Sequence, residues 1–154
     1  MSIENFSHLG ICVSDLAAST AFYRDGLGFD VLHEMPVKGP DAERLLELSP
    51  VELDVVYLQR DGVVIELLSF AAPGHESRAE PRPMNRVGLT HISLRVSDLD
   101  AVMTAIETSG GRVLRDTETR NPDYKMAVVF VTDPDGLRIE LLQAPGDPKS
   151  LPGA

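Results

Sequence analysis

The stretch DGVVIELL at residues 61–68 and its counterpart DGLRIELL at residues 135–142 decide the fold, because six of their eight residues are identical. Upstream of them, His8 and His91 each precede a Ser-Asp-Leu triplet whose aspartate follows the histidine by seven residues. The two features occur in the same order in both halves of the chain. Self-similarity of this kind defines the repeating structural unit. The sequence therefore predicts two copies of one module.

The first copy is longer than the second. From His8 to Glu66 is 58 residues and from His91 to Glu140 is 49, a difference of nine. We place the extra residues between Pro36 and Pro50, and we predict that they form a loop because proline interrupts regular structure.

Periodicity predicts the elements of each copy. Apolar residues alternate around His8, as in a strand with two distinct faces. A helix follows, with Ser14 or Asp15 as N-cap in the first copy and Ser97 or Asp98 in the second. Three further strands complete each copy, at about residues 29–34, 53–59 and 63–70 and at about residues 112–117, 126–132 and 137–143. The residues at 61–62 and 133–136 are typical of hairpin turns. Each copy is thus predicted to be a β-α-β-β-β unit.

These units lead to a prediction for the whole chain. The fold class is α+β, with two tandem β-α-β-β-β modules forming a curved mixed sheet around a metal-binding cup. We expect one domain over residues 1–154, with module one at about 3–70 and module two at about 87–143. An extended linker is predicted at about 71–86, where prolines and glycine cluster, and a flexible tail at about 144–154.

Composition excludes several classes of partner. Among 154 residues the formal net charge is −10, so nucleic acid and anionic membranes would be repelled. The N-terminus shows no signal peptide and no apolar run is long enough to span a membrane, which favours a cytoplasmic protein. A single cysteine, Cys12, cannot form an intramolecular disulfide, in keeping with a reducing compartment.

The repeated residues His8, Glu66, His91 and Glu140 predict a metal centre. Strand alternation places each of them opposite the strongest apolar set of its strand, and thus on the concave side of a curved sheet. Two carboxylates in such a cup carry a large desolvation penalty unless a cation binds them. Two imidazoles and two carboxylates suit one divalent ion in octahedral geometry, with two positions left for water or substrate oxygens. Ni, Co, Zn, Mn and Fe all fit this donor set.

Other readings of the same residues are weaker. A lone histidine is more often hydrogen-bonded or exposed than a ligand, and we read His33 and His75 that way. Glu66 taken alone would face solvent or pair with Arg60, and the repeat could be purely structural. Cys12 lacks an activating base, so we expect buried packing or a pocket wall. Arg95, on the His91 face, would neutralise an anionic substrate or form a salt bridge.

Three stretches carry a resemblance to a known family. They are HLGICVSDL at residues 8–16, the pattern S-x-x-F-Y-x-x-x-L-G-F at residues 19–29 and DPDGLRIEL at residues 133–141. They resemble the vicinal oxygen chelate superfamily, which includes glyoxalase I, methylmalonyl-CoA epimerase, extradiol dioxygenases, fosfomycin-resistance transferases and bleomycin-binding proteins. The resemblance covers nearly all of residues 5–143. It implies paired modules around a metal, a homodimer, and a ligand set of His8, Glu66, His91 and Glu140.

The resemblance also narrows the activity. Four protein ligands favour the proton-transfer branch, glyoxalase I or the epimerase, over members with three ligands or none. Cys12 stands where glyoxalase I has an arginine that binds glutathione, and Phe70 stands where an asparagine is usual. A more apolar substrate is therefore expected. The candidate substrate-binding residues are Cys12, Tyr57, Phe70 and Arg95.

The expected function is a metal-dependent lyase, isomerase or epimerase that moves a proton on a carbon next to a carbonyl of a small oxygen-chelating molecule. Glu140 is the expected principal base and Glu66 its partner. Two alternatives stay open. One is an extradiol-type dioxygenase that acts at Fe(II), and the other is a drug- or metabolite-binding resistance protein without catalysis. The sequence leaves open whether a site lies within one chain or is shared by two.

Overall fold

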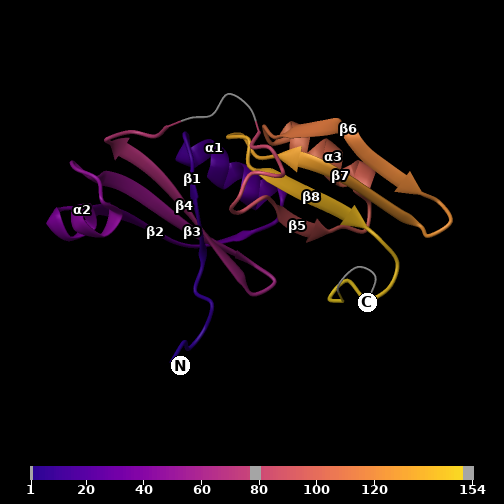
Figure 1. Ribbon diagram of the computed structural model, residues 1–154, viewed down its shortest axis with the longest axis horizontal. Coiled ribbons are helices and arrows are strands. Elements are labelled where there is room, and N and C mark those ends of the chain that lie inside the picture. Colours follow the sequence, from indigo (N-terminus) through magenta and orange to yellow (C-terminus); the bar gives the residue numbers. More distant parts are fainter. Residues whose placement is uncertain (1, 77–80, 151–154) are drawn as a thin grey trace. The chain divides into compact units, whose positions relative to one another are not determined.

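The computed structural model describes residues 2–76 and 81–150. The chain divides into two compact units, Met1–Ser77 and Arg78–Ala154. Each unit contains one four-stranded mixed sheet, as Figure 1 shows. The predicted α+β class with two tandem β-α-β-β-β modules is confirmed.

The first unit runs β1 (Leu9–Cys12), α1 (Leu16–Ala21), β2 (Asp30–Lys38), α2 (Pro40–Leu46), β3 (Glu52–Arg60) and β4 (Val63–Ala72), with a π-helical turn η1 (Phe22–Gly26) directly after α1. Its sheet has the order β1-β4-β3-β2. Strand β1 is parallel to β4, and the other pairs are antiparallel. The parallel pair is possible because α1 supplies the crossover between the edges of the sheet.

Helix α1 covers one face of this sheet. Asp15 is its N-cap, and the Asp15 carboxylate accepts a hydrogen bond from the backbone N–H of Ala18 at 2.9 Å. On the sheet side, Leu58, Ile65 and Leu67 are buried, and α1 contacts both strands that carry them. The predicted cap and helix start are confirmed, with Asp15 rather than Ser14 as the capping residue.

The predicted loop at residues 36–50 is wrong, because β2 continues to Lys38 and α2 follows it. Pro40 at the first helical position and two acidic residues in the first turn favour a helix start. Ala42 and Leu46, one turn apart, pack against the buried cluster of Val51, Leu53 and Val55. Tertiary packing therefore stabilises a helix that is too short to be stable alone. In Figure 1, α2 lies beside β2.

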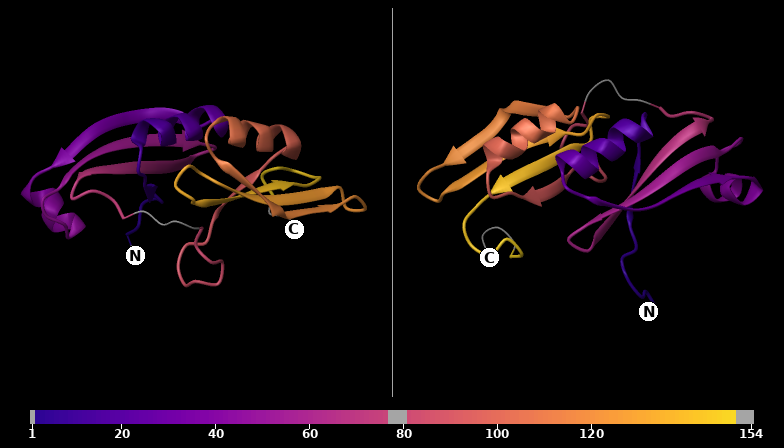
Figure 2. Two further views of the ribbon diagram at one scale, coloured as in Figure 1. Left: turned by 90° about the horizontal axis from the view of Figure 1, so that it is seen from above. Right: turned by 180° about the vertical axis from the view of Figure 1, so that it is seen from behind.

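The second unit runs β5 (Ile92–Arg95), α3 (Leu99–Thr108), β6 (Arg112–Asn121), β7 (Met126–Thr132) and β8 (Arg138–Gln143). Its sheet order, β5-β8-β7-β6, repeats that of the first unit, again with one parallel pair. Asp98 caps α3 by accepting the Ala101 N–H at 3.0 Å. Leu99, Met103 and Ile106 form the buried stripe of α3, which lies against the sheet in both views of Figure 2.

The first strand of each unit begins later than predicted, whereas the two hairpin turns are as predicted. β1 and β5 begin one residue after His8 and His91, so the histidines precede the strands instead of lying within them. The Asp61-Gly62 turn has φ of 52° and 80°, the left-handed pair that a tight hairpin requires. In the second unit, the buried Asp133 closes the turn by accepting the N–H groups of Asp135 and Leu137. Both hairpins are confirmed.

The segment predicted as a linker lies at about residues 71–86. The boundary between the units lies inside it, and its residues 77–80 fall outside the described part of the chain. Beyond them, the Arg82 guanidinium donates to the carbonyl oxygens of Arg86, Val87 and Leu89, so this part folds around one side chain. After Pro145, residues 147–150 form a turn around Asp147, and residues 151–154 of the predicted tail lie outside the described part of the chain.

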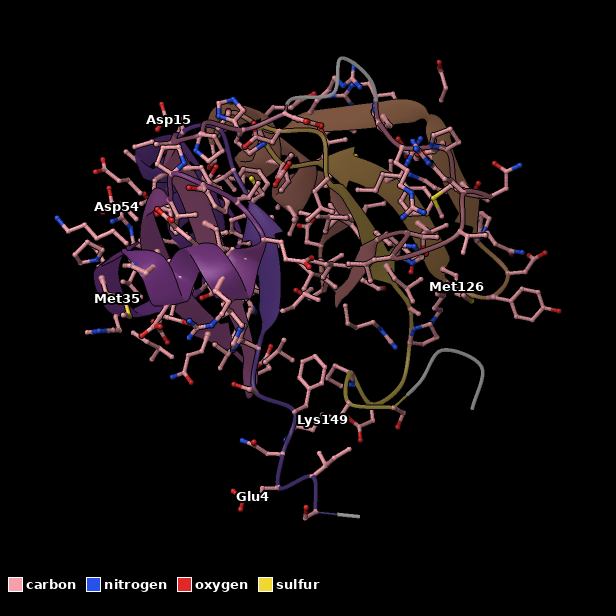
Figure 3. All side chains as sticks on the ribbon, turned by 60° about the vertical axis from the view of Figure 1, so that its left-hand side comes forward. Glu4, Asp15, Met35, Asp54, Met126 and Lys149 are labelled. Carbon is pink, nitrogen blue, oxygen red and sulfur yellow. The ribbon has the colours of Figure 1, made fainter. Side chains whose placement is uncertain are left out.

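Apolar side chains also occur on the surface. Met35 on β2 and Met126 at the start of β7, both labelled in Figure 3, are 40% and 38% exposed. Within residues 2–76 and 81–150, no helix is both long and apolar enough to cross a membrane.

Candidate metal centre

The two glutamates of the repeat lie opposite the buried faces of their strands. Ile65 and Leu67, which flank Glu66 in β4, are 1% and 0% exposed, whereas the Glu66 side chain is 15% exposed. In β8 the flanking residues are fully buried and the Glu140 side chain is 25% exposed. Strand alternation therefore turns both carboxylates away from the helix, as the sequence predicts.

Each glutamate meets the histidine of its own unit. The parallel register of β1 and β4 places Gly10 beside Glu66, and His8, just before β1, reaches the carboxylate. The His8 Nε2 atom lies 3.2 Å from Glu66 Oε2. In the second unit, His91 Nε2 lies 3.9 Å from Glu140 Oε2. The same topology thus creates the same pair twice.

A hydroxyl group orients each imidazole. Ser7 Oγ lies 3.0 Å from His8 Nδ1, and Thr90 Oγ1 lies 2.9 Å from His91 Nδ1. The residue before each histidine therefore occupies one ring nitrogen, and the other nitrogen faces the carboxylate. Histidines that bind metals commonly have their second ring nitrogen hydrogen-bonded in this way.

A second hydroxyl group binds each carboxylate, but from a different strand in each unit. The Tyr57 phenol, on β3, donates to Glu66 Oε1 at 2.5 Å. This hydrogen bond, together with burial, raises the pKa of Tyr57 to about 12. In the second unit Ser93, on β5, donates to Glu140 Oε1 at 2.8 Å. In both units Oε1 is held by the protein and Oε2 faces the histidine.

An aromatic ring stands against each histidine. Tyr57 meets His8 edge-on with ring centroids 5.6 Å apart, and Phe130 meets His91 in the same manner at 5.4 Å. Both rings come from the residue directly opposite the glutamate in the neighbouring strand. The backbone N–H of Phe130 donates to the Thr117 hydroxyl, which fills an irregularity in the β6–β7 pairing.

These contacts fit divalent-metal ligation. Each unit supplies one imidazole nitrogen and one carboxylate oxygen whose outer partners are already bound, a donor set that suits such ions. Among the described residues, no group of three or more His, Cys, Asp or Glu side chains that could hold a metal is found. The four-ligand set of His8, Glu66, His91 and Glu140 stays a prediction. The alternative pairing of Glu66 with Arg60 is not observed, since Arg60 contacts the Leu27 carbonyl and Asp61.

The other predicted residues lie in varied surroundings. Cys12 is exposed at the end of β1, so buried packing is wrong for it. Phe70 packs against the cluster of Val51, Leu53 and Val55, as does the Tyr57 ring. Arg95 donates to the carbonyl oxygens of Ala144 and Pro145, so one of its nitrogens holds the chain after β8. Their roles in substrate binding stay predictions, and His33 and His75 are exposed.

Several residues near the pairs are absent from the sequence prediction. Ser7 and Thr90 could have been found by aligning the two copies, since a hydroxyl residue precedes both histidines, whereas Ser93 aligns with Gly10 and gives no such signal. Arg138 lies two residues before Glu140 on the same face of β8, and its guanidinium carbon is 5.7 Å from the centre of the Phe130 ring. In the first copy Val64 occupies its place. At this position of the repeat, the second unit therefore has a positively charged side chain and the first unit has an apolar one.

Comparisons with known proteins agree with this fold. The family model of the Glyoxalase/Bleomycin resistance protein/Dioxygenase superfamily matches residues 5–141. A glyoxalase family protein from Bacillus cereus has a similar fold, with a TM-score of 0.81 at 18% identity over 95% of this chain and 97% of that one. The fosfomycin resistance protein FosX from Listeria monocytogenes, solved with Mn(II) and sulfate, has a TM-score of 0.60 at 17% identity over 96% and 98%.

Relatives by sequence carry several different names. "Uncharacterized protein YaeR" of Escherichia coli is 30% identical over 93% of this chain and 98% of its own length. "Probable lactoylglutathione lyase" of Synechocystis is 31% identical over 88% and 92%. "Ethylmalonyl-CoA/methylmalonyl-CoA epimerase" of Cereibacter sphaeroides is 28% identical over 92% and 98%.

Proposed function

The chain belongs to the Glyoxalase/Bleomycin resistance protein/Dioxygenase superfamily, and from that premise we propose that it is a metal-dependent enzyme of proton transfer. Its reaction moves a proton on a carbon next to a carbonyl of a small oxygen-bearing substrate, as a lyase, isomerase or epimerase does. Each His–Glu pair supplies one imidazole nitrogen and one carboxylate oxygen to a divalent metal centre, and a complete centre uses the pair of His8 with Glu66 and the pair of His91 with Glu140.

One observation carries this proposal. Both units contain a histidine whose Nδ1 is bound by the preceding hydroxyl residue and whose Nε2 faces a carboxylate oxygen. A purely structural repeat would need the apolar faces of β4 and β8, but it would not need the same polar constellation on the opposite faces. Repetition of the polar set therefore supports ligation.

The protein's own residues supply the proton chemistry. When bound, a divalent cation contributes Lewis acidity that makes a C–H bond next to a carbonyl more acidic. Glu140 accepts the proton as general base, and Glu66 is its partner in returning it. His8 and His91 keep their orientation throughout, because the hydroxyl groups of Ser7 and Thr90 hold their outer nitrogens.

The contacts of the two carboxylates support Glu140 as the principal base. Its Oε2 lies 3.9 Å from His91, whereas Glu66 Oε2 lies 3.2 Å from His8. The Glu140 side chain is also the more exposed of the two, at 25% against 15%. A carboxylate with longer contacts and more solvent around it can change its position at a lower cost in free energy. A general base needs this freedom to reach the substrate proton and to return it.

Relatives support the reaction class. Two sequence relatives are named "Probable lactoylglutathione lyase" and "Ethylmalonyl-CoA/methylmalonyl-CoA epimerase", and this chain matches both over most of their length. Both names describe chemistry next to a carbonyl group. We therefore favour proton transfer over ring cleavage with oxygen and over binding without catalysis.

The test measures incorporation of solvent deuterium. Metal-loaded protein is incubated in heavy water with 2-oxo acids, hemithioacetals and acyl-CoA thioesters, and NMR follows exchange at the carbon next to the carbonyl. Glu140→Gln should lower the exchange rate by at least about 100-fold, since it removes the general base. His75→Ala, which changes an exposed histidine after β4, is the control. No exchange with any of these substrates, or oxygen uptake with a catechol, would contradict the proposal.

A further inference from the structure

We propose that Tyr57 and Ser93 are positioning residues that do one task from opposite sides of the glutamate strand. Each hydroxyl holds Oε1 of the glutamate in its own unit, so that Oε2 is directed toward the histidine and is the oxygen offered to the metal. This inference rests on the proposed function, because it assigns a role in metal binding to residues outside the ligand set.

The strand registers show that the hydroxyl donor comes from a different adjacent strand in each unit. In the first unit Gly10, Glu66 and Tyr57 are neighbours across β1, β4 and β3. In the second unit Ser93, Glu140 and Phe130 are neighbours across β5, β8 and β7. The parallel neighbour bears the hydroxyl in one unit and the antiparallel neighbour bears it in the other. Each glutamate thus has a hydroxyl donor from one adjacent strand, while the other adjacent strand supplies a residue without a hydroxyl group.

The geometry explains how each donor reaches its glutamate. Tyr57 reaches Glu66 Oε1 with a long rigid ring that packs against the cluster of Val51, Leu53 and Val55. Ser93 needs only a short side chain, because the parallel register places it directly beside Glu140. At Gly10, a Cβ atom would lie 3.6 Å from Glu66 Oε2 and 3.4 Å from Leu68 Cδ1, which are ordinary contacts. The first unit therefore has room for a side chain at Gly10, but the nearest carboxylate oxygen would be Oε2, which faces His8, and not the Oε1 that Tyr57 holds.

The two hydrogen-bond donors restrain the rotation of the two carboxylates to different degrees. A packed phenol at 2.5 Å restrains Glu66, whereas an exposed serine at 2.8 Å restrains Glu140. A carboxylate held through one oxygen presents the other to a cation with less loss of rotational freedom. Tyr57 consequently makes Glu66 the better-fixed of the two carboxylates.

The decisive measurement is the affinity of the full chain for Co²⁺ alone, by calorimetric titration and by the visible absorption of the bound ion. Tyr57→Phe should weaken binding by about 10-fold to 100-fold, the range for loss of an outer partner of a ligand. Adding Gly10→Ser to Tyr57→Phe should not restore the affinity, because a Cβ atom at Gly10 lies 3.6 Å from Oε2, the oxygen that faces His8, and the serine would not hold Oε1. Tyr124→Phe, at an exposed tyrosine, is the matched control.

The second unit allows the hydroxyl donor to be moved from β5 to β7. Ser93→Ala should weaken Co²⁺ binding, and Phe130→Tyr in the same chain should restore it. Far-ultraviolet circular dichroism and the melting temperature of the metal-free variants check that each one folds. Restoration in the double variant of Ser93→Ala with Phe130→Tyr separates positioning from a general structural role, since a merely destabilised site would not recover on addition of a hydroxyl.

The outcomes distinguish this inference from the proposed function. If the wild-type chain binds no Co²⁺, or if His8→Ala binds it as well as the wild type, the metal function and the inference both fall. If Glu66→Ala weakens binding but Tyr57→Phe does not, only the inference is overturned. Failure of Phe130→Tyr to recover the affinity lost in Ser93→Ala overturns the exchange of donors between strands, and recovery supports it.

Discussion

At the scale of single residues, the two units share more polar contacts than identical residues. Ser7 and Thr90 differ in type, yet each one places a hydroxyl oxygen on the Nδ1 atom of the following histidine. Tyr57 and Ser93 do not align at all, yet each one binds the Oε1 atom of its glutamate. Polar contacts around the two pairs are therefore matched by function even where the residues have diverged.

Tyr57 gives a prediction about pH. Its hydrogen bond to Glu66, followed by burial, raises its pKa to about 12. Because the folded chain favours the neutral phenol, the stabilisation is fully present below the ordinary pKa of 10.0 and is lost as the pH rises through about 12. We expect the tyrosinate absorbance of the metal-free protein to include a step near this pH that Tyr57→Phe removes. An unchanged titration curve in the variant would contradict the prediction.

At the scale of elements, capping aspartates define where α1 and α3 begin. The Asp98 carboxylate accepts the N–H of Ala101, and Asp15 does the same for Ala18. Asp98→Ala should lower the free energy of unfolding by about 1 kcal/mol, while Asp98→Asn, which keeps an acceptor, should cost only a small part of that. Urea denaturation measures both. Equal losses for the two variants would show that the side-chain acceptor is not the stabilising feature.

Strand β4 gives a second prediction at this scale, because burial changes along its helix-facing side from the exposed start of the strand to its middle. Leu67 is fully buried against the helix side, and Val63 at the start of the strand is 52% exposed. Leu67→Ala should reduce the free energy of unfolding by about 2–5 kcal/mol, whereas Val63→Ala should change it by about 0.5 kcal/mol or less. Denaturant unfolding compares them, and similar losses in both would contradict the difference in burial between these two positions of one face.

At the scale of the whole molecule, metal binding should be visible as stability. An ion that binds the folded chain and not the unfolded one contributes about 2.7 kcal/mol at a free concentration about 100 times its Kd. For a chain of this length, that corresponds to a rise in Tm of roughly 5–10 °C. Calorimetry before and after EDTA treatment measures it, with His91→Ala as the variant that should lose the shift. Identical melting of the loaded and the EDTA-treated wild type would count against the centre.

The sequence by itself determined the two modules, their β-α-β-β-β order, the Ser-Asp pairs that contain both helix caps and the faces on which Glu66 and Glu140 lie. Each of these depends on local signals, namely periodicity, turn residues and repetition, which the chain carries within a few residues. The prediction was least accurate where a local signal was weak. The loop predicted at residues 36–50 contains α2, because only the packing of Ala42 and Leu46 on a buried cluster makes seven residues helical.

Tertiary structure alone decided which donors reach the carboxylates. Tyr57 and Glu66 are nine residues apart and Ser93 and Glu140 are 47 apart, and in both cases a strand register brings them together. Register depends on how whole strands pair, so it cannot be inferred from the identity of one residue. The same holds for Arg82, whose three carbonyl partners exist only once the chain has folded around it. Long-range pairing, and not local preference, arranges the polar chemistry of each unit.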